Sequence, residues 1–227
     1  PAHQRVDLSR LLLLELEQSD VMTAAHFSPD AKQIVTASRD GLAQLWDAQT
    51  GKPVFKPFEH GNAVVAAAFT PDGIQFVTGS RDRLLQIWDR QTGREAGPPL
   101  EHPAGLRPGA LHFNQNGGQV VTAAGNSAYV WHVENGRPVC PPLDHADLVL
   151  DAQFSPDGRI IATASRDDTA RFWDLATGLP LSEPLPHGAR VECLAFSPDG
   201  RWLATAAADG SVQLWEVPLV TAPTPEW

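Results

Sequence analysis

The sequence predicts an all-β fold built from five consecutive copies of one small unit. Five tryptophans recur every 42 or 43 residues, at Trp46, Trp88, Trp131, Trp173 and Trp215. Phenylalanines keep the same period, at Phe27, Phe69, Phe113, Phe154 and Phe196. Histidines follow it at His60, His102, His145 and His187. Repeats of roughly 40–45 residues are typical of propeller blades and similar arrays.

The repeats define the expected organisation of the 227-residue chain. Each unit needs its neighbours to bury its faces, so one continuous array is expected. We expect a lead-in over residues 1–9, the array over residues 10–217 and a proline-rich tail over residues 218–227. The repeats are expected at about residues 18–59, 60–101, 102–144, 145–186 and 187–217.

The second repeat shows how each unit divides into four strands. The expected strands span residues 64–69, 74–80, 84–88 and 95–100. Thr70-Pro71-Asp72-Gly73 predicts the first turn, because proline presets φ and glycine accepts a positive φ. The last strand contains Pro98 and Pro99 and should lie at a sheet edge, since proline cannot donate to a neighbouring strand.

The two ends of the chain suggest how the array closes. The fifth repeat stops after its third strand, and residues 10–17 align with the outer strand of the other repeats. A closed ring of five four-stranded antiparallel blades is expected if this N-terminal strand completes the last blade, which protects the open edge. The alternative is that the five blades belong to a larger, seven-bladed ring with blades upstream. The missing initial Met favours an excerpt of a longer protein.

The repeats resemble the WD-repeat β-propeller family. Trp-Asp pairs end three predicted strands, at Trp46-Asp47, Trp88-Asp89 and Trp173-Asp174, whereas Trp131 and Trp215 are followed by histidine and glutamate. The Thr-Gly and Pro-Pro-Leu spacing is similar to that of bacterial WD repeats, which often accompany a serine/threonine kinase or another signalling module. The resemblance implies a non-catalytic scaffold that binds a protein or peptide around the central channel.

The resemblance also implies a structural hydrogen-bonded set in each blade, made of His, Ser, Asp and Trp. Two blades hold it complete, as His60, Ser80, Asp82, Trp88 and as His145, Ser165, Asp167, Trp173. We expect the serine to accept from the indole N–H, which can only donate. A repeated buried set is not the single exposed nucleophile of a hydrolase, so no catalytic residue is expected.

Arginines recur just before the turn aspartate, the position that this resemblance places on the loop face. They are Arg39, Arg81 and Arg166, and Arg107 and Arg190 lie in loops that lead into inner strands. Arginine forks match carboxylate and phosphate, so an acidic or phosphorylated peptide is one expected partner. The competing interpretation is that each arginine pairs with a neighbouring acid such as Asp40 or Asp168 and contributes little.

Composition limits the other functions. A net charge of −10 disfavours nucleic acid as a partner, although anion or nucleic-acid binding through the arginines stays an alternative. No run reaches the roughly 18 apolar residues of a membrane span, so no membrane partner is expected. The sequence has no metal-binding Cys/His spacing, which predicts no metal and no cofactor. Two unrelated cysteines and no signal peptide favour the cytoplasm.

Overall fold

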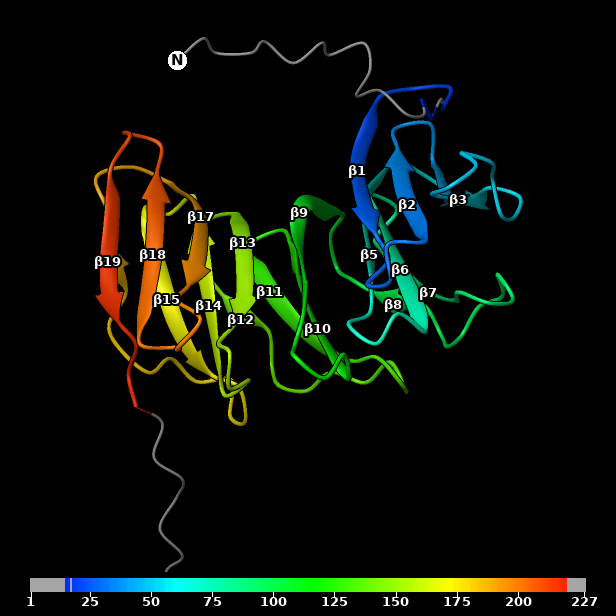
Figure 1. Ribbon diagram of the computed structural model, residues 1–227. Coiled ribbons are helices and arrows are strands. Elements are labelled where there is room, and N and C mark those ends of the chain that lie inside the picture. Colours follow the sequence, from blue (N-terminus) through cyan, green and yellow to red (C-terminus); the bar gives the residue numbers. More distant parts are fainter. Residues whose placement is uncertain (1–14, 17, 220–227) are drawn as a thin grey trace, which may run out of the picture.

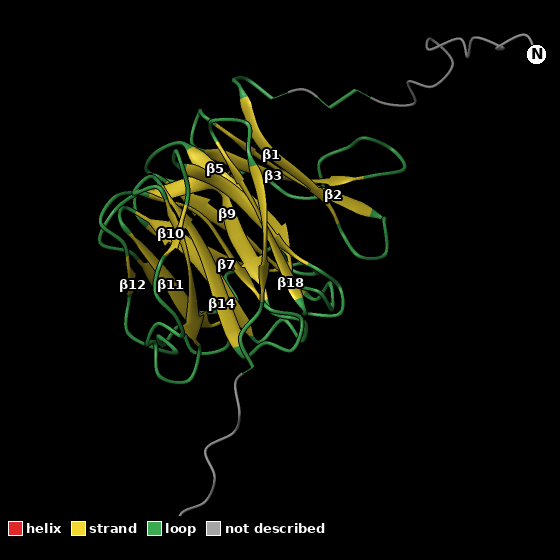
Figure 2. Ribbon diagram, turned by 90° about the vertical axis from the view of Figure 1, so that its left-hand side faces the viewer, coloured by secondary structure: helices red, strands yellow, loops and turns green. Residues whose placement is uncertain are grey.

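The computed structural model describes residues 15–16 and 18–219, and the regular structure of this part is β-strand throughout (Figures 1 and 2). The strands form five separate sheets in sequence order, and neighbouring strands within each sheet are antiparallel. We call each sheet with its turns a blade. The all-β prediction is therefore confirmed.

Four blades have four strands and the fifth has three described strands. The first blade contains β1 (Met22–Phe27), β2 (Gln33–Ser38), β3 (Leu42–Asp47) and β4 (Phe58–Glu59). The second contains β5 (Val64–Phe69), β6 (Gln75–Ser80), β7 (Leu84–Asp89) and β8 (Leu100–Glu101). The third contains β9 (Leu106–Phe113), β10 (Gln119–Ala124), β11 (Ser127–His132) and β12 (Leu143–Asp144). The fourth contains β13 (Val149–Phe154), β14 (Ile160–Ser165), β15 (Thr169–Asp174) and β16 (Leu185–Pro186). The fifth contains β17 (Val191–Phe196), β18 (Trp202–Ala207) and β19 (Val212–Glu216).

Side chains in the first turn of each blade explain why the sequence reverses there. The Thr70 hydroxyl donates to Asp72 Oδ1 over 2.6 Å and accepts from the Gln75 N–H over 3.1 Å. Gly73 takes a φ of +69°, which a residue with a Cβ adopts only at a cost. Hydrogen bonds within the turn therefore hold its shape without contacts to the neighbouring blade.

The outer strand is shorter than expected. In the second blade it is reduced to the two residues of β8 and an isolated bridge between Trp88 and Glu95. Pro98 and Pro99 stand between these two contacts and have no N–H to donate, so the ladder is interrupted. The segment over residues 95–100, expected as a strand, is therefore mostly irregular. We call this outer segment of each blade its outer strap.

The core lies between blades. Val35, Ala37 and Leu45 of the first blade are fully buried against Val64 and Phe69 of the second. Equivalent clusters join the second to the third blade, the third to the fourth and the fourth to the fifth. A side chain such as Leu45 contributes about 2 kcal/mol when it leaves water, so these four contacts hold the array together.

The blades follow an arc, with β1–β3 at one end and β17–β19 at the other (Figure 1). No hydrogen-bonded ladder among the described strands joins the first sheet to the last. A closed five-bladed ring is therefore not confirmed. The expected closing strand falls on residues 10–17, of which only residues 15 and 16 belong to the described part.

Candidate binding site on the loop rim

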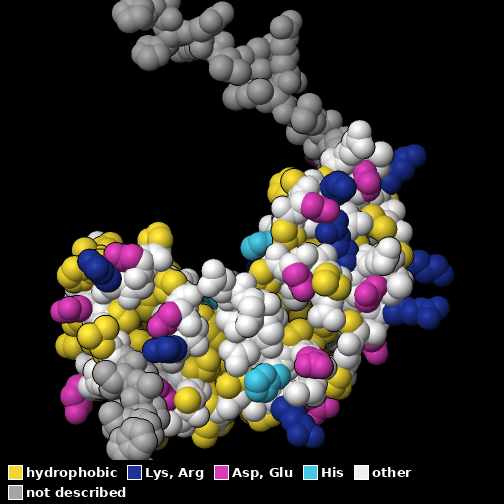
Figure 3. Space-filling view, turned by 60° about the horizontal axis from the view of Figure 1, so that its bottom comes forward, with side chains coloured by type: hydrophobic (Ala, Val, Ile, Leu, Met, Phe, Trp, Pro, Cys, Tyr) yellow, Lys and Arg dark blue, Asp and Glu magenta, His cyan; other side chains and the backbone are white. Residues whose placement is uncertain are grey.

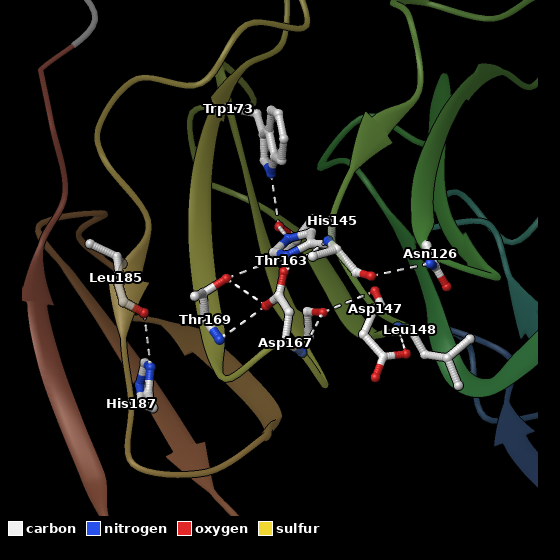
Figure 4. Close-up of polar contacts among 12 residues, drawn as sticks. Asn126, His145, Asp147, Leu148, Thr163, Asp167, Thr169, Trp173, Leu185 and His187 are labelled. Carbon is white, nitrogen blue, oxygen red and sulfur yellow. Dashed lines mark hydrogen bonds and ion pairs between the residues drawn. The ribbon is translucent and has the colours of Figure 1, made fainter.

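A hydrogen-bonded relay centred on a buried threonine organises each blade. In the fourth blade the Trp173 indole N–H donates to Thr163 Oγ1 over 2.8 Å, and Thr163 Oγ1 lies 2.7 Å from His145 Nε2 (Figure 4). His145 Nδ1 lies 2.9 Å from Asp167 Oδ2. A carboxylate only accepts, so Nδ1 carries the proton and Nε2 accepts from the threonine hydroxyl.

This arrangement corrects the expected role of the serine. Ser165 Oγ donates to the carbonyl of Asp147 over 3.1 Å and accepts from the Asp167 N–H, and it does not bond Trp173. Ser80 does the same with Asn62 and Asp82 in the second blade. The serine lies at the end of its strand beside the turn, whereas the threonine two residues earlier faces the indole.

The same threonine occurs in every blade. The tryptophan donates to Thr36, Thr78, Thr163 or Thr205 in four of them. In the first blade Gln18 Oε1 accepts from the Thr36 hydroxyl over 2.6 Å, so glutamine occupies the place of the histidine. The sequence analysis missed these threonines, although they stand nine or ten residues before each tryptophan.

The third blade uses a shorter connection. Its Trp131 indole N–H donates directly to His102 Nε2 over 3.1 Å, and Thr122 Oγ1 lies 2.8 Å from the same nitrogen. His102 Nδ1 donates to the Leu100 carbonyl over 3.1 Å. The relay is therefore kept although this blade has neither the serine nor the turn aspartate.

Burial sets the charge state of the relay. It lowers the pKa of His102 to about 4, so this imidazole is neutral near pH 7. Burial would raise the pKa of Asp167, but hydrogen bonds from Thr169, His145 and the Ala146 N–H outweigh it and hold that pKa at about 2. Burial also lowers the pKa of His145. In the fourth blade the relay therefore pairs a neutral His145 with an ionised Asp167. A buried network with its hydrogen bonds satisfied makes the blade rigid.

The turn that the relay fixes carries the predicted arginines. The N–H groups of Arg39, Arg81 and Arg166 donate to carbonyl groups of the loop that enters the first strand of the same blade, over 2.9–3.0 Å. The turn and the entry loop therefore share one rim of the array. Arg39, Arg81 and Arg166 have exposed side chains, and Arg107, at the start of β9, is half-buried.

Two of the predicted arginines, Arg81 and Arg166, lie within electrostatic range of a third, Arg107. Burial, and then the charges of Arg166 and Arg81, lower the pKa of Arg107, while Asp147 and Glu192 act in the opposite direction. Within the described residues none of these three arginines forms an ion pair. We call Arg81, Arg107 and Arg166 the arginine cluster.

The other two arginines are placed differently. Arg190 Nε lies 2.5 Å from Glu192 Oε1, so its charge is balanced locally. Arg39 belongs to the first blade and does not contribute to the shift of Arg107. The predicted pairs of Arg39 with Asp40 and of Arg166 with Asp168 do not occur among the described residues.

Two further features were sought in the described part of the chain, a metal-binding group and a membrane-spanning helix. The described residues hold no group of three His, Cys, Asp or Glu side chains that could bind a metal ion. In the same part of the chain no helix has the length and apolar character needed to cross a membrane.

Fold and relay together define a repeat protein of the β-propeller class. The family model "WD domain, G-beta repeat" matches residues 11–47, 51–89, 138–174 and 180–216. The chain therefore belongs to the WD40 repeat family, whose repeats generally mediate protein–protein interaction. The unmatched interval contains Trp131 and the direct bond to His102, which is where the blade departs most from the other four.

A solved structure supports the same architecture. The chain is similar to the computationally designed Ika8 protein, with a TM-score of 0.77 and 27% identity over 90% of this chain. The chain spans 61% of that designed chain. The comparison with curated proteins finds no match.

Proposed function

We propose that this chain is a non-catalytic scaffold whose arginine cluster binds an acidic or phosphorylated peptide. The observation that carries the proposal is the approach of three arginine charges from three consecutive blades without an ion-pair partner among the described residues. Burial, and then the like charges of Arg166 and Arg81, lower the pKa of Arg107, so keeping this guanidinium charged costs free energy. A bound anion would relieve that cost.

Geometry supports a peptide ligand. Arg81 and Arg166 stand on rigid turns that the relay fixes, and half-burial restricts the side chain of Arg107. Guanidinium groups held in place lose little entropy on binding carboxylate or phosphate oxygens. The nearby Asp147 and Glu192 reduce the local positive charge, which disfavours a long polyanion such as nucleic acid relative to a short acidic segment.

Charge reversal tests the proposal. Fluorescence anisotropy would compare R81E/R166E with the unmodified chain, using a degenerate peptide library with one fixed phosphoserine and its serine and glutamate versions. The double variant is expected to lose at least about tenfold in affinity, because two charge-assisted contacts become repulsive. The matched control R94E/R137E makes the same charge change at exposed arginines on the outer straps and should bind normally.

The outcomes separate the candidate ligands. Equal binding by both double variants would exclude the arginine cluster as the site. Equal binding of the serine, phosphoserine and glutamate peptides would exclude recognition of negative charge. Displacement of the peptide by a single-stranded oligonucleotide, with a steep dependence on salt, would favour nucleic acid instead.

We further propose that the chain acts in the cytoplasm as a regulatory module of a bacterial signalling protein. Cys140 and Cys193 are free thiols, which supports a reducing compartment. The link to a serine/threonine kinase stays a prediction from the resemblance, and copurification of the full-length protein with kinase activity would test it.

A further inference from the structure

A cavity opens at the outer edge of the third blade, between β11 and the outer strap. Its volume is about 490 Å³, within the range of about 300–1,000 Å³ that is typical of ligand sites. Its wall includes Glu101, Pro103, Tyr129, Trp131, Cys140 and Pro142. The second and fourth blades pack on the two sides of the third, so neither end of the chain is needed to form this cavity. We call it the strap pocket.

Two aromatic rings form part of the wall of the strap pocket. The rings of Tyr129 and Trp131 are stacked, with their centroids 6.2 Å apart and an angle of 22° between their planes. Trp131 is half-buried, whereas Trp46, Trp88 and Trp173 are at most 8% exposed. The third blade therefore leaves accessible an aromatic surface that three other blades bury.

The first blade shows which group fills the matching space there. Gln44 occupies the repeat position of Tyr129, two residues before the tryptophan of its blade. Gln44 Nε2 donates to the carbonyl of Phe55 in the outer strap over 2.8 Å. Cys140 matches Phe55, because each comes two residues after the bridge between strap and tryptophan. No described side chain of the third blade donates to the Cys140 carbonyl in place of the Gln44 amide.

The fourth blade shows that a guanidinium group fits beside the tryptophan at this position. Arg171 matches Gln44 and Tyr129, and its Cζ lies 5.7 Å from the centroid of the Trp173 ring. A cation within about 6 Å of an aromatic centroid is attracted to the ring, and indole attracts it most strongly. The planar guanidinium also carries N–H donors for carbonyl groups. An arginine side chain therefore combines the ring contact of Arg171 with the hydrogen bond of Gln44.

The charge around the strap pocket favours a cation. Among the described residues, Glu101 is the one charged residue in its wall. Burial, and then the negative charge of Asp174, raise the pKa of the Cys140 thiol, so a carboxylate acts on this part of the strap. Acidic side chains are spread over the face of the molecule shown in Figure 3, in keeping with the net charge of −10. A basic segment would be attracted to such a chain.

We propose that the strap pocket binds an arginine side chain from a basic segment of a partner protein. The guanidinium stacks on Tyr129 and Trp131, donates to the carbonyl of Cys140 and faces the carboxylate of Glu101. The partner thus supplies what Gln44 and Arg171 supply within their own blades. The strap pocket lies at the outer edge of one blade, so this contact is independent of an acidic segment held by the arginine cluster on the loop rim.

The chain has a single tyrosine, which makes Tyr129 a specific probe of the strap pocket. NMR of the chain with ¹³C-labelled tyrosine would follow titration with Gly-Gly-Arg-Gly-Gly and with versions that carry lysine or citrulline. The arginine peptide should shift the Tyr129 ring signals to saturation. Citrulline keeps the planar group and removes its charge, so its peptide should bind at least about tenfold more weakly.

Variants locate the contact within the pocket. E101Q should weaken binding of the arginine peptide about two- to fivefold, because an exposed ion pair is lost. The matched control E59Q changes the same position of the first blade and should bind normally. Y129R copies Arg171 and should block the pocket with an internal arginine, which the indole N–H signal of Trp131 would report. Y129Q copies Gln44 and repeats the test if Y129R misfolds.

Several results would contradict the proposal. A Tyr129 signal that the arginine peptide leaves unchanged would overturn it. Equal affinities for the arginine and citrulline peptides would show that charge is not recognised, and tighter binding of the lysine peptide would show that the planar group is not. Undiminished binding by both Y129R and Y129Q would place the site outside the strap pocket.

Discussion

Removing the hydroxyl of Thr78 tests the relay that organises the blades. Thr78 is fully buried, and its Oγ1 lies 2.8 Å from both Trp88 Nε1 and His60 Nε2. T78V keeps the shape of the side chain, so it creates almost no cavity, but it leaves the indole N–H and the imidazole nitrogen without partners. Each buried unsatisfied group costs about 1–3 kcal/mol. We therefore expect T78V to lower the free energy of unfolding by about 2–4 kcal/mol.

The third blade provides a matched control. In T122V the Trp131 indole N–H keeps His102 Nε2 as its acceptor, at 3.1 Å. T122V loses the contact between Thr122 and His102 and a longer one, of 3.4 Å, between Thr122 Oγ1 and the Tyr129 carbonyl, so we expect a cost of about 1 kcal/mol. The difference between the two losses in free energy of unfolding measures the contribution of the hydrogen bond from the indole N–H to the threonine.

Urea unfolding followed by tryptophan fluorescence would give both free energies, and NMR would follow hydrogen exchange at the two indole N–H groups. T78V should accelerate exchange at Trp88, while T122V should leave exchange at Trp131 nearly unchanged. If T78V costs no more than T122V, the threonine is not the acceptor on which the blade depends.

Three further predictions concern His102 and two left-handed turn positions. The folded-state pKa of His102 is about 4 and the unfolded value is about 6.5, so its contribution to stability is complete above pH 6.5. As the pH falls towards 4 the unfolded state binds more protons, and roughly 3 kcal/mol should be lost. H102Q, which copies Gln18 of the first blade, should flatten this dependence of the urea midpoint on pH. R83G should raise the free energy of unfolding by about 0.5 kcal/mol because Arg83 has a φ of +77°. G41A should lower it by more than about 1 kcal/mol because its Cβ would lie 3.0 Å from the His60 carbonyl.

The repeated sheets could be predicted from the sequence because each tryptophan occupies one fixed position in the strand pairing of its blade. The spacing of the tryptophans therefore equals the length of one blade. Trp88 lies opposite Phe76 in the antiparallel ladder, and in each of the other blades the tryptophan lies opposite an aliphatic residue of the second strand. The sequence did not predict the role of Thr78, because a β-branched residue inside a strand is expected whether or not its hydroxyl is used. Only the packed blade brings Thr78 beside the indole, one diagonal step from the residue opposite it.

The placement of the arginines was predicted in part for a similar reason. The recurrence of Arg81 and Arg166 placed both on one rim, but which arginines meet depends on how consecutive blades are stacked. Arg107 joins them because β9 begins beside the second blade, where the Cβ of any larger residue at position 105 would lie 2.9 Å from the Arg81 carbonyl. The pairing of Arg190 with Glu192 was open to prediction from their closeness in sequence, because Arg190 directly precedes β17 and Glu192 is the second residue of that strand.

The arc of five blades with four contacts has a consequence for how the protein comes apart. Among the described residues, the first and the last blade each pack on one neighbour, so either can detach by breaking a single contact. An interior blade is held on both sides. Amide protection should therefore fall from the third blade towards each terminus. In a closed ring every blade would have two neighbours, so unfolding could not start from an end blade.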